Sequence, residues 1–219
     1  MFIGHFGLGF GAKKAASGIS LGTLFIAVQF LDLLWPVFLL LDIEHAVLKP
    51  GTGHSQPIGF TDYPVSHSLL MVLGWALLFG FVYWLIKKNI KAAIILALCV
   101  ISHWVLDLIV HLPDLPLYPG SNSPKLGFEL WNSFWGTLLV EGGIFIAGLV
   151  LYMRSTTAKN KQGSIGLWIL TGLLLVSHAA NLLGPPPPAM NAVAWAGNLQ
   201  WLFVILAYWV DHNRLASNK

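Results

Sequence analysis

The sequence predicts an all-α integral membrane protein, a polytopic helix bundle of about six transmembrane helices plus a short N-terminal half-helix. It is expected to form a single transmembrane domain over residues 1–219. Only 10% of the residues are charged and 56% are hydrophobic, whereas a soluble domain carries about a quarter charged residues. The apolar residues form runs of about 20, the length that crosses a bilayer as a helix. The basic residues gather in alternate connections between these runs.

Each long apolar run can cross the membrane once. The predicted spans are residues 20–41, 66–86, 90–111, 132–153, 164–183 and 189–210. Residues 1–12 are apolar but too short to cross, so we expect an interfacial or re-entrant half-helix there. Its Gly7 and Gly11 are four residues apart, a spacing that allows close packing against another helix.

The basic residues predict the orientation of the bundle. With six spans, ten of the 12 Lys and Arg residues fall on one side: Lys13, Lys14, Lys87, Lys88, Lys91, Arg154, Lys159, Lys161, Arg214 and Lys219. Only Lys49 and Lys125 fall on the other side. The positive-inside rule makes the basic side cytoplasmic, so both termini are predicted there and the connections 42–65 and 112–131 are predicted outside. The net charge of +3 is thus a signal of topology, and nucleic acid is excluded as a partner.

Several ionisable residues lie within or at the ends of the predicted spans. They are Asp32, His67, His103, Asp107, His111, Glu141 and His178. A charge near the bilayer centre costs at least about 2.5 kcal/mol, so such residues normally face the bundle interior and mark a site. The predicted topology places all seven in the outer half of the membrane and leaves the cytoplasmic half nearly bare of polar residues. This common depth favours one site over seven unrelated buried residues.

The spacing and type of these residues indicate a metal site. His103 and Asp107 are four apart and share one helical face, which His111 continues. Histidine and carboxylate side chains from several helices are the ligands expected for zinc or another divalent metal. His5 can join them, because a helix that starts back from Lys13 would place it roughly 12 Å into the membrane. A buried His–Asp hydrogen bond that only ties helices together is the alternative.

Asp32 is a further candidate ligand. Pro36 follows it by one turn, and a proline inside a helix frees a backbone carbonyl and predicts a local kink. For His111, Glu141 and His178 we expect supporting or structural roles next to the ligands.

Four short motifs occur in order along the first half of the chain. They are Gly4-His5-Phe6, Leu31-Asp32-Leu33, Ser66-His67-Ser68-Leu69-Leu70 and His103-Trp104-Val105-Leu106-Asp107. In these motifs the chain resembles the membrane-bound metal-dependent hydrolases of bacterial inner membranes, the LexA-binding inner-membrane-associated hydrolase-like family. The resemblance implies a multi-pass protein of the bacterial inner (plasma) membrane. It also implies metal-site positions at His5, Asp32, His67, His103 and Asp107.

The chain departs from that family at two places. The second aspartate of the family's Pro-Asp-x-Asp-like motif is replaced here by Leu33 or Leu34, and the run Asp62-Tyr63-Pro64-Val65 stands where the family has His-Arg-Gly. We therefore predict one metal ion in place of a two-metal centre, with Zn²⁺ as the first candidate.

These observations favour a metal-dependent membrane hydrolase. The metal would lower the pKa of its bound water, and Glu141 or Asp107 would act as general base. A site in the outer half of the bilayer suggests a membrane lipid as partner, with a lipid ester or phosphoester as substrate.

Two other functions use the same residues. The main alternative is a transporter or channel for a metal ion or protons, because such pathways also use intramembrane His and Asp residues. A path would need polar residues in both halves of the bundle, which the sequence does not offer. The third alternative is a scaffold with a closed structural metal site. The oligomeric state is left open.

Overall fold

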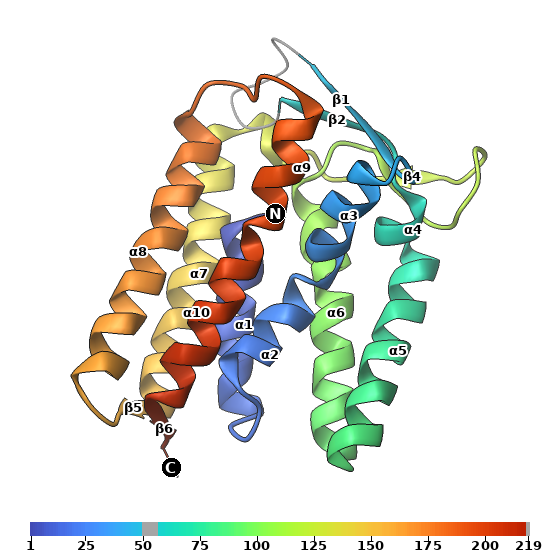
Figure 1. Cartoon of the computed structure of the whole chain (residues 1–219). Coiled ribbons are helices and arrows are strands. Elements are labelled where there is room, and N and C mark those ends of the chain that lie inside the picture. The colour runs from blue at the N-terminus through green and yellow to red at the C-terminus, as the bar shows by residue number, and fades with distance from the viewer. Residues whose placement is uncertain (50–56, 218–219) are drawn as a thin grey trace.

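The computed structural model describes residues 1–49 and 57–217, and it confirms an all-α polytopic membrane bundle (Figure 1). Five helical segments are long and apolar enough to cross a membrane: α5 (Leu69–Lys87), α6 (Ile90–Val110), α7 (Phe134–Ser155), α8 (Lys161–Leu183), and α9 (Met190–Asn198) with α10 (Gln200–His212). The sixth span is the bent pair α2 (Leu21–Val28) and α3 (Phe30–Leu40). Large apolar side chains such as Leu77, Leu139 and Leu183 are more than 70% exposed on the outside, as lipid contact requires.

The first span is broken, but not where the sequence predicted. Helices α2 and α3 meet at Gln29 with an angle of 59° between them, while Pro36 lies inside α3. At the break the Val28 carbonyl oxygen is hydrogen-bonded by a side chain: His103 Nδ1 lies 2.7 Å from it. Pro36 has no backbone N–H to donate to the Asp32 carbonyl oxygen. This oxygen instead lies 3.4 Å from the side-chain amide nitrogen of Gln200. The break at Gln29 was not predicted from sequence, the carbonyl that Pro36 frees is present, and the kink at Pro36 stays a prediction.

The predicted half-helix is α1 (Ile3–Ala15), which lies inside the bundle and packs along α7 (Figure 1). Glycines allow this close approach. A Cβ on Gly7 would lie 2.5 Å from Phe145 Cα, and one on Gly148 would lie 1.8 Å from the Gly7 carbonyl oxygen. A Cβ on Gly11 would lie 3.6 Å from the Gly148 Cα. The packing predicted from the Gly7 and Gly11 spacing is confirmed, and it brings the first turn of α1 to the centre of the bundle.

Short elements cover the upper end of the bundle, where the sequence predicted only loops (Figure 1). They are the antiparallel pair β1 (His45–Leu48) and β2 (Ile58–Asp62), the one-turn helix α4 (Pro64–His67), the pair β3 (Leu115–Pro116) and β4 (Lys125–Leu126), and the 3₁₀ turn η1 (Leu130–Asn132). Residues 50–56 of the first predicted loop lie outside the described residues. At the lower end, β5 (Thr156–Ala158) pairs with β6 (Arg214–Ala216).

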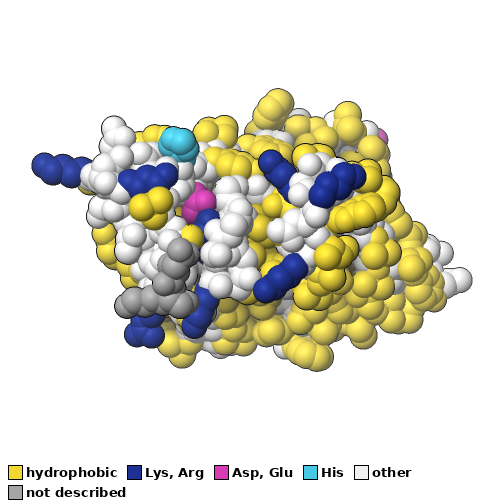
Figure 2. All heavy atoms as spheres, turned by 90° about the horizontal axis from the view of Figure 1, so that it is seen from below, with side chains coloured by type: hydrophobic (Ala, Val, Ile, Leu, Met, Phe, Trp, Pro, Cys, Tyr) yellow, Lys and Arg dark blue, Asp and Glu magenta, His cyan; other side chains and the backbone are white. Residues whose placement is uncertain are grey.

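Most of the basic residues that the structure describes share the lower end of the bundle; Lys219 lies outside the described residues. Helix α1 ends at Lys13 and Lys14, α5 ends at Lys87, and α8 begins at Lys161. Figure 2 shows Lys and Arg side chains over this end, with hydrophobic side chains around the sides. Met1 is buried within the bundle. Within the N-terminal segment, the predicted cytoplasmic orientation therefore concerns the end of α1. Which side of the membrane this basic end faces stays a prediction.

The lower half of the bundle also holds a buried ion pair, which the sequence analysis missed. Lys13 is 4% exposed, and its Nζ donates to Asp211 Oδ2 at 2.8 Å and to the Ile19 carbonyl at 2.7 Å. The Tyr152 hydroxyl donates to Asp211 Oδ1 at 3.1 Å. The prediction that this half is nearly bare of polar residues was thus wrong in detail, because Asp211 follows the predicted end of the last span. These bonds use both Asp211 oxygens and tie α1, α7 and α10 together.

The basic end provides a test of orientation. Asn89 lies between α5 and α6 in the basic connection, so we expect Asn89→Cys, in a Cys99→Ala background, to be protected from a membrane-impermeant thiol reagent in intact cells. Labelling after the cells are opened is the positive control. External labelling of intact cells would invert the proposed orientation.

The contact between α1 and α7 provides a test of packing. Gly148→Ala should lower the stability of the protein by about 1–3 kcal/mol, because even a methyl group would collide with the Gly7 backbone. The matched control is Gly143→Ala on the same helix, where nothing lies within 4 Å of the added Cβ. The control should be neutral or slightly stabilising, since alanine favours helix over glycine by about 1 kcal/mol. Thermal unfolding in detergent measures both, and equal melting temperatures would contradict the close contact.

Candidate metal centre

Four histidines and two aspartates converge in the part of the bundle that is remote from the basic helix ends. The residues are His5 of α1, Asp32 of α3, His67 of α4, His103 and Asp107 of α6, and His111 directly after α6. All are at most 3% exposed except Asp32, whose side chain is 24% exposed. All five predicted ligands are therefore brought together, and His111 joins them.

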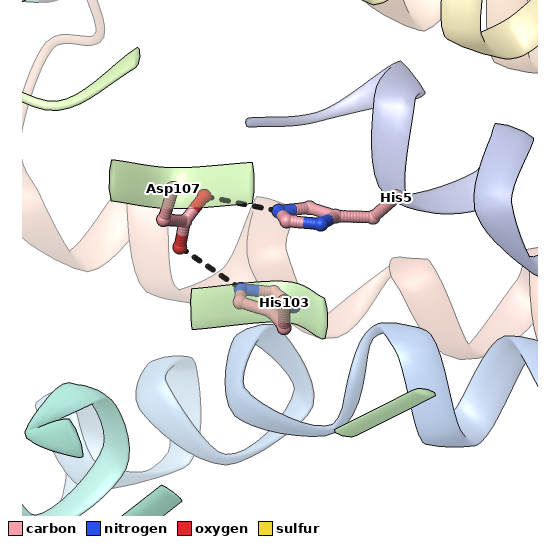
Figure 3. Close-up of side chains that lie close together, drawn as sticks. All are labelled: His5, His103 and Asp107. Carbon is pink, nitrogen blue, oxygen red and sulfur yellow. Dashed lines mark hydrogen bonds and ion pairs between the residues drawn. The ribbon is translucent and has the colours of Figure 1, made fainter. Parts of the chain in front are cut away.

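Asp107 lies at the middle of this cluster. Its Oδ1 accepts a hydrogen bond from the Met1 α-amino group and lies 3.0 Å from His5 Nε2. Its Oδ2 lies 3.1 Å from His103 Nε2. Figure 3 shows the two histidine rings lying parallel and pointing at different oxygens of this one carboxylate. Their ring centroids are 3.7 Å apart with an interplanar angle of 9°.

The remaining ligand atoms surround Asp107 Oδ2 and Asp32 Oδ1. The Nε2 atoms of His67 and His111 each lie 3.8 Å from Asp107 Oδ2. The Nε2 atoms of His67 and His103 each lie 3.6 Å from Asp32 Oδ1. Three histidines thus direct the same ring nitrogen into a space bounded by two carboxylates.

Hydrogen bonds behind two of these rings fix their tautomers. His103 Nδ1 lies 2.7 Å from the Val28 carbonyl oxygen, which can only accept, so Nδ1 carries the proton. His111 Nδ1 donates in the same way to Asp114 Oδ1 at 2.8 Å. Burial and the neighbouring Asp114 raise the pKa of Tyr63 well above its usual value, so its hydroxyl stays protonated and also donates to Asp114 Oδ1, at 3.0 Å. In both histidines Nε2 is the ring nitrogen that faces the cluster.

A longer relay fixes the third ring. Glu44 is 1% exposed, and its Oε2 accepts from the Ser66 hydroxyl at 2.6 Å while its Oε1 accepts from the Ser66 backbone at 2.7 Å. The Ser66 oxygen can then accept from His67 Nδ1, 2.7 Å away. His67 Nε2 is left with its lone pair toward the cluster. Such carboxylate-backed histidines are typical of metal ligands.

The cluster therefore brings histidine nitrogens against carboxylate oxygens. The Nε2 atoms of His67, His103 and His111 face these oxygens at 3.1–3.8 Å. A proton on Nε2 or a shared cation compensates the buried carboxylates. Two ligands about 2.0–2.1 Å from a tetrahedral ion are about 3.3 Å apart, which matches the observed spacing. Two groups have ligand atoms that all lie within 4.8 Å of one another: Asp32, His67 and His103, and His5, His103 and Asp107.

Glu141 and His178 lie outside this ligand cluster, on the wall of a cavity that also reaches Asp32, His67 and Asp107. Glu141 Oε2 accepts from the Phe2 backbone at 2.8 Å. His178 stacks on the Phe2 ring, with centroids 6.4 Å apart, and neither of its ring nitrogens has a partner among the described residues. Both residues are placed to meet a ligand of the cavity, which goes beyond the supporting roles expected from sequence.

The sequence analysis missed Glu44 and Asp114, which lie in its predicted external loops. Glu44 is far from His67 in the chain, with no helical spacing to it, so only the tertiary fold reveals it. Asp114 follows His111 by three residues but lies beyond the end of α6, where a helical period does not apply. The Ser66-His67 dipeptide was the one local signal, since a hydroxyl next to a ligand can orient it.

Comparison with protein families gives one match that decides the family. Residues 2–184 match the family described as YdjM inner membrane protein. The chain belongs to this family. Every residue of the cluster, together with Glu44, Glu141 and His178, falls within the matched range. The multi-pass inner-membrane location predicted from sequence is thereby confirmed. No curated protein and no solved structure matches the chain.

Metal content provides a direct test of the cluster. We expect the purified protein to hold about one divalent ion per chain, and His103→Ala or Asp107→Ala to remove most of it. Glu44→Gln should leave the fold intact but weaken metal affinity about 10–100-fold, because it loosens the relay behind His67. His45→Ala, on a half-exposed strand residue, is the control. Elemental analysis and competition with a chelator measure these effects, and full retention in both alanine variants would show that the cluster is structural.

Proposed function

We propose that this protein is a metal-dependent membrane hydrolase with a single divalent ion, for which Zn²⁺ is the first candidate. The ligands are drawn from His5, Asp32, His67, His103 and Asp107. The observation that carries the proposal is that the Nδ1 atoms of His103 and His67 are held by Val28 and Ser66, so that both Nε2 atoms face buried carboxylates. The resemblance to membrane-bound metal-dependent hydrolases supports the same choice. When bound, such an ion lowers the pKa of a coordinated water and polarises an ester or phosphoester.

The ligand chemistry favours zinc over harder ions. Imidazole nitrogen with carboxylate oxygen suits zinc, whereas magnesium and calcium prefer oxygen alone. Two aspartates supply two negative charges, which one divalent ion balances. The partial exposure of Asp32 leaves one side of the centre open to the cavity, as a catalytic site requires and a closed structural site does not.

Of the two general bases considered from sequence, the geometry favours Glu141. Both oxygens of Asp107 face nitrogen atoms of Met1 or histidine, so this carboxylate serves as ligand and organiser. Glu141 has one oxygen held by the Phe2 backbone, and its side chain lines the cavity beside the centre. Glu141 can accept a proton there without leaving the ligand set. His178 lies on the same wall.

The outer-side location of this centre belongs to the same proposal. The cluster lies away from the basic helix ends, so a cytoplasmic basic end would put it toward the periplasm. A substrate would then reach it from the outer leaflet or the aqueous side.

Transport is less well supported by the structure. Below the centre, Phe6, Phe10, Phe25, Phe145 and Leu170 form a core whose members are at most 1% exposed. Farther down, Lys13 and Asp211 are bonded to each other, with Tyr152 on the second oxygen of Asp211. An ion crossing the bundle would have to shed its water within the aromatic core and then break this pair.

Hydrolysis and flux can be compared on one reconstituted sample. In sealed proteoliposomes we expect no metal or proton flux, and slow, chelator-sensitive hydrolysis of a lipid ester or phosphoester. Glu141→Gln should lower the rate about 10²–10⁴-fold while metal content is kept. Asp32→Ala and His67→Ala should lose both metal and activity. Metal-dependent flux that these two substitutions abolish, with no hydrolysis across a broad lipid panel, would reject the enzyme and favour the transporter.

A further inference from the structure

The cavity beside the metal centre is larger than the chemistry alone requires. Its volume is about 1170 Å³, above the range of about 300–1,000 Å³ that is usual for small-molecule sites. The centre borders it through Asp32, His67 and Asp107. The remainder extends between α8 and α10, where Leu182, Phe203 and Leu206 make its wall apolar.

This cavity opens sideways toward lipid. Leu173 of α8 and Leu202 and Ile205 of α10 line it, yet they are 44%, 54% and 61% exposed on the outside of the bundle. Nearer the basic end the same two helices pack closely against each other. A Cβ on Gly163 would lie 2.1 Å from the Asn213 carbonyl oxygen, and one on Gly166 would lie 2.4 Å from the Trp209 ring. The two helices are therefore in close contact at the basic end, and the exposed lining residues place the opening on the apolar flank.

We propose that the cavity binds a phosphate-bearing membrane amphiphile, which enters between α8 and α10 and presents its headgroup to the metal centre. This inference rests on the proposed hydrolase and names its substrate class. The alkyl chain lies along the apolar wall, where Leu173 and Ile205 continue the hydrocarbon of the bilayer. The headgroup reaches the side of the centre on which Asp32 is exposed.

Charge supports an anionic headgroup. Among the basic residues that the structure describes, only Lys49 and Lys125 lie outside the basic end, and Lys49 lines this cavity. A divalent ion at the centre would offer a phosphate oxygen a cation to bind, in addition to the positive charge of Lys49.

His178 is assigned as a positioning residue for the headgroup. It is 6% exposed, lines the cavity, and carries two ring nitrogens without partners among the described residues. A buried polar group of this kind costs free energy unless a ligand satisfies it. Polar atoms of a bound headgroup would supply the missing hydrogen bonds.

Photocrosslinking tests this binding mode without relying on turnover. The probe is phosphatidic acid with a diazirine in its acyl chain, added to the full-length protein in detergent and mapped by mass spectrometry. We expect crosslinks on α8 and α10 residues that line the opening, and competition by unlabelled phosphatidic acid but not by a neutral diacylglycerol.

Matched variants locate the binding within the cavity. Ser177→Trp fills it and should lower labelling severalfold, whereas Val176→Trp, one residue along and 67% exposed to the outside, should leave labelling unchanged. His178→Phe keeps a ring against Phe2 but removes both nitrogens, and should weaken the preference for phosphatidic acid over diacylglycerol. Equal labelling in both tryptophan variants, or labelling spread evenly over all lipid-facing helices, would overturn the inference.

The metal-free protein separates this inference from the proposed hydrolase. The Asp107→Asn variant, prepared without metal, should still be labelled by the probe. Adding Ser177→Trp to this variant should block the labelling. Such labelling with no hydrolysis of any substrate in the wild type would keep the amphiphile site and reject the enzyme. Hydrolysis of a water-soluble phosphoester, unaffected by Ser177→Trp and without labelling, would keep the enzyme and reject the amphiphile site.

Discussion

The buried carboxylate of Asp107 is the constraint on which the rest of the structure depends. It is 1% exposed within an apolar bundle, where an uncompensated charge would be very costly. Compensation comes from the Met1 α-amino group and His5 on one oxygen, and from His103 close to the other. Met1 and His5 come from the start of the chain and from α1, whereas Asp107 and His103 belong to α6. The need to satisfy one carboxylate therefore fixes how α1 and α6 are placed relative to each other.

Unusual features of the backbone serve the same end. Glycines let α1 lie against α7 closely enough for His5 to reach the centre. The break at Gln29 turns α3 by 59° from α2 and offers the Val28 carbonyl to His103. In a bilayer an unbonded carbonyl is expensive, so a helix break is tolerated where a side chain satisfies it. The break and the ligand orientation therefore stabilise each other.

Depth and residue type were sufficient to predict from sequence which residues form the cluster, because lipid imposes a simple rule on charged side chains. His5, Asp32, His67, His103 and Asp107 followed from that rule, from helical spacing and from a family resemblance. The supporting carboxylate of Glu44 did not, since it reaches Ser66 through a chain reversal of 22 residues that no period encodes. The break at Gln29 and the pair of Lys13 with Asp211 were missed for a related reason. Both depend on partners far away in the chain.

The two ends of the bundle differ in a way that bears on function. At the basic end, Gly163 and Gly166 hold α8 tightly against α10, and both Asp211 oxygens are bonded to protein groups. At the other end the same helices line a cavity with His178, whose ring nitrogens have no partner among the described residues. A conduction path needs both ends to be able to open, whereas a site that works on lipid needs only one opening, toward the leaflet that supplies the substrate. The asymmetry therefore fits chemistry on a membrane-borne molecule better than passage through the membrane.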